Sequence, residues 1–157
     1  MKIVIDGVIG CDVTANNIRS ELEGKSEDIE LEISSPGGSV FEGFTISNVL
    51  KQYKRDNKIK IVTNITGMAA SMSSYIALVG DKIVVSESSS FIIHNAWSFS
   101  VGDFREMRKE ADLLEKLSNI IAKEYERSTE QSIDLIKSAM DEETFLFGQE
   151  IIDFGFA

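Results

Sequence analysis

Short runs rich in isoleucine and valine alternate along this chain with longer stretches of helical periodicity. Such runs are typical of buried strands, and they cover Lys2 to Asp6, Ile29 to Ile33, Ile59 to Ile65, Lys82 to Ser86 and Ser90 to Ile93. Helical stretches lie between them, at Thr14 to Glu23, Ser39 to Tyr53 and Met68 to Val79. The alternation predicts an α/β fold with a largely parallel sheet.

A long amphipathic stretch follows from Phe104 to Tyr125. Its apolar residues recur at three- and four-residue steps, at Phe104, Met107, Ala111, Leu114, Leu117, Ile121 and Tyr125, with Leu113 and Ile120 widening the stripe. This spacing predicts one helix with a broad apolar face, which either packs on its own domain or forms an interface. Two shorter helices, Ser132 to Met140 and Gly148 to Phe154, are predicted to close the chain.

Composition narrows the class of protein. A chain of 157 residues with 43% hydrophobic residues is expected to form one domain with a sizeable core. The net charge of −10 argues against non-specific nucleic-acid binding. The single cysteine, Cys11, excludes an internal disulfide and fits a reducing cytoplasm. No apolar run approaches the roughly 18 residues of a membrane span. Asp6 interrupts the N-terminal apolar run at a point where the apolar segment of a signal peptide would continue. We expect a cytoplasmic protein without nucleic-acid or membrane partners.

Three short motifs together indicate acyl-transfer chemistry. They are Ser35-Pro36-Gly37-Gly38-Ser39, Gly67-Met68-Ala69-Ala70-Ser71-Met72 and Phe91-Ile92-Ile93-His94. A serine needs an adjacent base to act as a nucleophile, and His94 is the only histidine. A glycine pair can present main-chain N–H groups to a developing oxyanion. Each motif alone is more often structural, but their order along the chain favours Ser71 as nucleophile and His94 as general base.

The ordered motifs resemble the Clp protease proteolytic subunit family, and more narrowly its phage and prophage relatives, the Clp-like head maturation proteases. The resemblance rests on Ile33 to Val40, Gly67 to Met72, Ile92 to Asn95, Met140 to Phe145 and Gln149 to Gly155. It implies an α/β spiral of β-α units, of the kind that Clp proteases share with crotonases, and a long protruding handle helix. It also implies a single peptidase domain over 1–157, with a head at 1–100, the handle at 101–127 and closing helices at 128–157.

The resemblance implies the roles of further residues. Glu143 stands where the family has the aspartate of its catalytic triad, and Asp141 is the alternative acid. Gly38 and Met72 match the family's oxyanion-hole positions, and a substrate strand would lie beside Gly37, Ser39 and Val40. No cofactor and no metal ion is implied.

The implied activity is that of a serine endopeptidase on protein or peptide substrates, with phage capsid or scaffold proteins as the expected targets and self-association into rings. Family subunits carry a segment before the first strand that helps to dock an unfoldase ATPase. This chain begins in its first strand, so such docking is not expected. In the family an aspartate and a short strand commonly follow the last helix, which leaves open whether the C-terminus of this chain is clipped.

Three alternatives stay open at this point. One is a catalytically degenerate subunit that assembles without cutting, which the glutamate at position 143 favours. Another is a crotonase-like acyl-CoA enzyme, whose glycine-pair oxyanion device is similar but which does not need Ser71 and His94. The last is a peptidase with a serine-lysine dyad of the signal-peptide peptidase type, which would require a membrane anchor.

Overall fold

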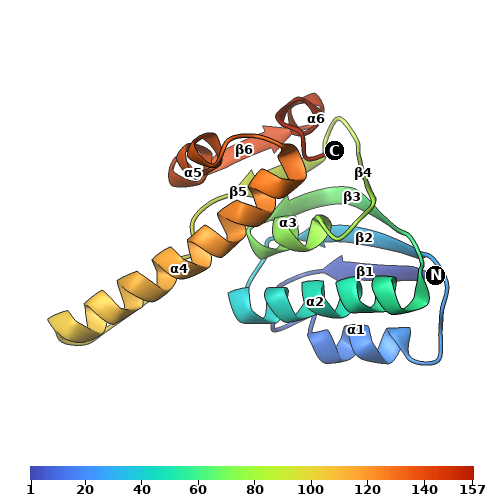
Figure 1. Cartoon of the computed structure of the whole chain (residues 1–157), viewed down its shortest axis with the longest axis horizontal. Helices are drawn as coiled ribbons and strands as arrows, with labels where there is room; N and C mark the ends of the chain where they lie inside the picture. The colour runs from blue at the N-terminus through green and yellow to red at the C-terminus, as the bar shows by residue number, and fades with distance from the viewer.

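Six strands form one sheet, and helices follow or flank them, in the computed structural model, which describes residues 1–157 (Figure 1). The strands are β1 (Lys2–Asp6), β2 (Ile29–Ser35), β3 (Ile61–Ala70), β4 (Lys82–Val85), β5 (Ser90–Ile93) and β6 (Thr144–Phe147). The helices are α1 (Ala15–Leu22), α2 (Val40–Asn57), α3 (Met72–Ala77), α4 (Phe104–Thr129), α5 (Ile133–Asp141) and α6 (Gln149–Phe154).

The sheet has the order β1-β2-β3-β5-β6, with β4 pairing β3 beside this path. All pairs among β1 to β5 are parallel, which confirms the predicted α/β architecture. The antiparallel edge strand β6 was not predicted. Its four residues are too few for a clear two-residue alternation, and only Leu146 among them is buried. The region predicted to hold only closing helices therefore also contributes a strand.

Strand β3 is longer than predicted because it changes partners along its length. Val62 to Ile65 pair with β4, and Met68 to Ala70 pair with β5. The prediction of a helix from Met68 was wrong for these three residues. Methionine and alanine favour helices, but pairing with β5 overrides that preference here. The helix begins only at Met72, so Ser71 is the single residue between a strand and a helix.

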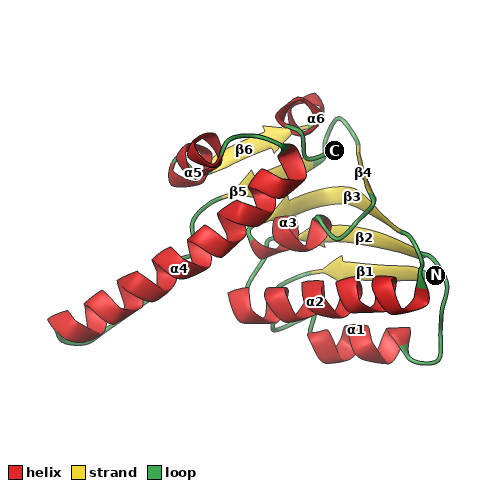
Figure 2. Cartoon of the chain, viewed as in Figure 1, coloured by secondary structure: helices red, strands yellow, loops and turns green.

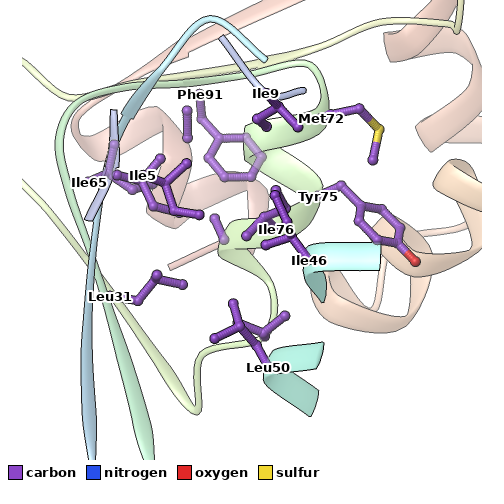
Figure 3. Packing of buried hydrophobic residues seen from close by; sticks show 14 of the residues in the cluster. Ile5, Ile9, Leu31, Ile46, Leu50, Ile65, Met72, Tyr75, Ile76 and Phe91 are labelled. Atoms are coloured by element: carbon purple, nitrogen blue, oxygen red, sulfur yellow. The ribbon is translucent and has the colours of Figure 1, made fainter. Parts of the chain in front are cut away.

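The core lies between the sheet and the helices on one of its faces (Figures 2 and 3). Ile5, Leu31 and Ile65 point from β1, β2 and β3 toward Ile46 of α2 and Ile76 of α3 (Figure 3). Burying each such side chain contributes roughly 1.5–3 kcal/mol relative to leaving it in water. This packing fixes α3 firmly against the strands whose ends carry the motif residues.

Helix α4 divides its apolar stripe between two environments. Its C-terminal half packs on the core, with Leu117 only 7% exposed and Tyr125 fully buried. Its N-terminal half extends beyond the sheet, with Phe104 64% and Met107 43% exposed (Figure 1). The C-terminal half of the stripe therefore packs on its own domain, as one interpretation predicted. The N-terminal half is left exposed, as the interpretation of an interface requires. Neither α4 nor any other helix is both long and apolar enough to cross a membrane.

Candidate active site

Strand pairing brings Ser71 and His94 to the same edge of the sheet. Strands β3 and β5 run parallel with Ala70 opposite Ile92, and the Ser71 N–H donates to the Ile92 carbonyl at 2.9 Å. Ser71 follows β3 and His94 follows β5, so both leave the sheet at neighbouring carboxyl ends. Both side chains line one cavity of about 350 Å³.

The main chain at Ser71 has an unusual conformation. Its φ of 56° and ψ of −127° lie in a region that costs a non-glycine residue about 1–3 kcal/mol. The surrounding bonds hold it there, since its carbonyl accepts from the Ser74 N–H at 3.0 Å and from the Ser74 hydroxyl. A sharp turn of this kind between strand and helix presents a nucleophile clear of the main chain.

Ile9 holds the glycine turn at Gly37-Gly38 from one side. The Ile9 N–H donates to the Gly37 carbonyl at 2.8 Å, and the Ser39 N–H donates to the Ile9 carbonyl at 2.9 Å. In a trans peptide the Gly38 N–H points opposite to the Gly37 carbonyl, hence away from Ile9. No group of the protein accepts from the Gly38 N–H. Gly37 and Gly38 both line the cavity that contains Ser71 and His94.

No side chain fits at either glycine. A Cβ on Gly37 would lie 2.6 Å from the Ser71 Cβ, and one on Gly38 would overlap the Ile9 carbonyl oxygen. Both have positive φ, 92° and 147°, which glycine adopts most readily. The Met72 nitrogen lies 3.0 Å from the Cβ position of Gly37, so the main chain at Met72 closely approaches the glycine turn.

The predicted substrate-binding segment is only partly in the cavity. Gly37 and Val40 line it, whereas Ser39 uses its N–H for Ile9 and its hydroxyl to accept from the Glu42 N–H at the start of α2. The remaining lining residues are Val8, Pro36, Ala96 and Trp97. Val8 lies in the loop after β1, where no sequence motif points to a site.

One hydrogen bond determines the tautomer of His94. Its Nδ1 lies 2.7 Å from the carbonyl oxygen of Asn95. A carbonyl only accepts, so Nδ1 carries the proton and Nε2 is left as an acceptor. That is the tautomer a general base needs. Ser71 and His94 share no hydrogen bond in this structure, and such contacts often tighten only when substrate binds.

Two carboxylates lie next to the His94 segment, and neither is bonded to the imidazole. The β5–β6 register ends with the pair Ile93 and Thr144, so His94 and Glu143 are the residues that adjoin this last pair along the chain. Glu143 itself has a φ of 51° and an exposed side chain, and its carboxylate accepts no hydrogen bond. Asp141, at the end of α5, accepts from the Asn95 side-chain amide at 2.7 Å. Asp141 therefore holds the residue whose carbonyl fixes the His94 tautomer.

Comparison with known proteins agrees with this fold and chemistry. The family model described as Clp protease matches residues 4–157. The chain is 30% identical over 145 residues to the ATP-dependent Clp protease proteolytic subunit 2 of Synechococcus sp., which covers 91% of this chain and 72% of that relative. It is also 30% identical over 149 residues to proteolytic subunit 1 of Prochlorococcus marinus, covering 90% and 74%. The chain therefore belongs to the Clp protease family, and the prediction of a serine-type peptidase is confirmed at the level of that family.

Proposed function

We propose that this chain is a serine endopeptidase in which Ser71 is the nucleophile and His94 the general base. The main-chain N–H groups of Gly38 and Met72 would form the oxyanion hole. The observation that carries the proposal is the strained turn at Ser71, held by Ile92 at the wall of a cavity that His94 and Gly38 also line. Strain of this size persists where the surroundings enforce it, and it is concentrated at functional sites.

The proposed reaction follows from these positions. The Ser71 Oγ attacks the scissile carbonyl carbon while His94 Nε2 takes its proton. Negative charge then develops on the carbonyl oxygen, and the unpaired Gly38 N–H stabilises it. His94 returns the proton to the leaving amine, and water repeats the sequence on the acyl-enzyme. The Gly38 carbonyl is also unpaired, and its position beside the cavity suits an extended peptide.

Protein substrates and a ring-shaped assembly are part of the proposal, because the relatives matched are proteolytic subunits of Clp proteases by name. The narrower role, maturation of phage heads by cleavage of capsid or scaffold proteins, rests on the resemblance of the motifs described above. Testing that role requires the natural substrate, whereas the chemistry can be tested with the isolated protein.

Active-site labelling tests the proposed chemistry directly. A fluorophosphonate reacts with activated serines, so the protein should form a covalent adduct that peptide mass spectrometry assigns to Ser71, and it should hydrolyse unstructured peptides. A degenerate subunit or a crotonase-like enzyme would remain unlabelled under conditions in which a control serine protease is labelled. An adduct on another serine would overturn the assignment of Ser71.

The third catalytic group is proposed to be Glu143, with Asp141 acting through Asn95. Glu143→Gln should lower kcat about 10³- to 10⁴-fold, since the imidazolium loses its neighbouring charge. Asp141→Asn should cost less than about tenfold, because the new amide oxygen can still accept from Asn95 and such neutral bonds contribute about 1 kcal/mol. Steady-state peptide hydrolysis by the two variants measures this. The reverse order of effects would make Asp141 the acid and Glu143 an exposed turn residue.

We also propose that the exposed half of α4 joins two rings. Four apolar side chains of α4 are exposed, Phe104 and Met107 on one line of the helix and Leu113 and Ile120 on another. Exposed apolar surface of this kind usually marks an interface. The buried side chains of the helix, Leu117, Ile121 and Tyr125, would anchor it in each subunit.

Met107→Asp should dissociate the stacked assembly into single rings or monomers, because a buried charge in an apolar contact costs several kcal/mol. Light scattering coupled to size exclusion at micromolar concentration measures the particle mass. The thermal stability of the subunit should change little, since Met107 is 43% exposed in the single chain. Asp112→Lys is the matched control, because Asp112 is exposed and lies on neither of the two apolar lines of the helix. Its larger change in charge should leave the assembly intact, and equal dissociation by both variants would remove the argument for the stripe.

A further inference from the structure

Two serines behind the glycine turn have no part in the reaction proposed above. Ser35 and Ser73 are both fully buried, and neither lines the cavity. The Ser73 Oγ lies 2.7 Å from the Ser35 carbonyl oxygen and 2.8 Å from that of Ala70. The Ser35 Oγ donates to the Gly7 carbonyl at 2.7 Å and accepts from the Gly37 N–H at 3.1 Å. Any role in catalysis must act through the groups they hold.

Ser73 joins the two strand ends that carry the site. Ser35 is the last residue of β2 and precedes the glycine turn, while Ala70 is the last residue of β3 and precedes Ser71. The β2–β3 ladder is irregular between Ile33 and Ser35, so its regular register does not by itself align these ends. The Ser73 hydroxyl has one proton to share between the Ser35 and Ala70 carbonyls. It thereby holds both strand ends against the first turn of α3.

Ser35 determines how the glycine turn presents its donors. Its hydroxyl satisfies the Gly37 N–H from one direction, and Ile9 satisfies the Gly37 carbonyl from another. The two peptides that flank the Gly37 Cα, Pro36–Gly37 and Gly37–Gly38, are thereby each held by one hydrogen bond. The Gly38 N–H is left as the unpaired donor beside Ser71. Donors in an oxyanion hole act only when they are already oriented at the position of the developing charge.

We propose that Ser35 is a positioning residue for the oxyanion hole and that Ser73 supports it. The inference rests on the proposed peptidase function and adds to it the side chains that orient the Gly38 N–H. On this inference the two buried hydroxyls help to stabilise the transition state and do not contribute to substrate binding.

Ser35→Ala tests the inference. The Gly37 N–H loses its partner, so the turn can shift, and a misplacement on the order of 1 Å costs about 10²-fold in rate. We expect kcat for peptide hydrolysis to fall about 10- to 100-fold with KM nearly unchanged. The affinity for a peptide boronate, which mimics the tetrahedral intermediate, should fall in parallel with kcat. Ser35→Cys, which keeps a weak donor of similar shape, should recover part of the loss.

Ser89→Ala is the matched control. Ser89 is also fully buried, and its Oγ likewise donates to one carbonyl, that of Ile65 at 2.6 Å, and accepts from one N–H, that of Ser86 at 2.8 Å. It precedes β5, whereas His94 follows that strand. The control should lose a similar amount of thermal stability while its kcat stays at the wild-type value. A purely structural role of Ser35 would make the two variants behave alike.

These experiments distinguish a failure of the proposed peptidase function from a failure of the positioning role of Ser35. An unlabelled, inactive wild-type protein contradicts the proposed function itself. An active wild type together with a Ser35→Ala variant whose kcat matches that of Ser89→Ala overturns the positioning role alone. If Ser35→Ala fails to fold, Ser73→Ala provides the second measurement, because it removes the bridge to the Ser35 carbonyl and leaves the Gly37 bond in place. A folded Ser73→Ala variant with wild-type kcat and boronate affinity would then overturn the inference.

Discussion

Replacing Ser71 by alanine should lower the rate of peptide hydrolysis about 10⁶-fold, to the residual level that binding and the oxyanion hole sustain without a nucleophile. The protein should remain folded, because the Ser71 hydroxyl has no hydrogen bond to lose in the free protein. The bonds that hold the turn come from its main chain, to Ile92 and Ser74. Alanine can occupy the same backbone conformation at a similar cost, since both residues carry a Cβ.

Three measurements on Ser71→Ala check this result. Peptide turnover and fluorophosphonate labelling should both disappear, while light scattering should show an assembly of unchanged mass. Ser20→Ala, which removes an exposed hydroxyl from α1, is the control and should be labelled like the wild type. Turnover that survives in Ser71→Ala, after contaminating proteases have been excluded by a second purification, would refute the assignment of the nucleophile.

Strand positions were predictable where composition and position agree. The bounds of β1 and β5 were predicted without error, because Lys2–Asp6 and Ser90–Ile93 are short isoleucine-rich runs. The end of β3 was not, because Met68 to Ala70 favour a helix locally and become a strand only through pairing with β5. Local propensity cannot register a partner that lies about twenty residues further along the chain.

The position of the candidate site was predictable for a topological reason. Parallel strands bring their carboxyl ends to one edge, so residues that follow β3 and β5 had to approach each other. The hydrogen-bond partner of each individual group was not predictable. Ser39 belongs to the expected substrate segment by sequence, yet its N–H and hydroxyl serve Ile9 and the start of α2. Helical periodicity likewise predicted the stripe of α4 but carries no information on which half the domain covers.

Replacing His94 by alanine should lower the hydrolysis rate to nearly the same level as Ser71→Ala, since a serine without its base is as ineffective as no serine. Combining both substitutions should therefore add almost nothing to either one alone. This non-additivity is the signature of two groups acting as one unit, and independent contributions would instead multiply. Steady-state kinetics on the two single variants and the double variant measures it.

The role of His94 as a base also fixes the direction of the pH dependence. Only neutral imidazole accepts the serine proton, so kcat/KM for the wild type should be lower in acidic than in neutral solution. The Asn95 carbonyl accepts from Nδ1, which leaves Nε2 as the acceptor in the neutral form. Particle mass must be measured across the same range, so that loss of the assembly is not mistaken for titration. A flat profile with an intact assembly, together with a His94→Ala variant that retains turnover, would assign proton transfer to another group. That group could not be an imidazole, because His94 is the only histidine in the chain.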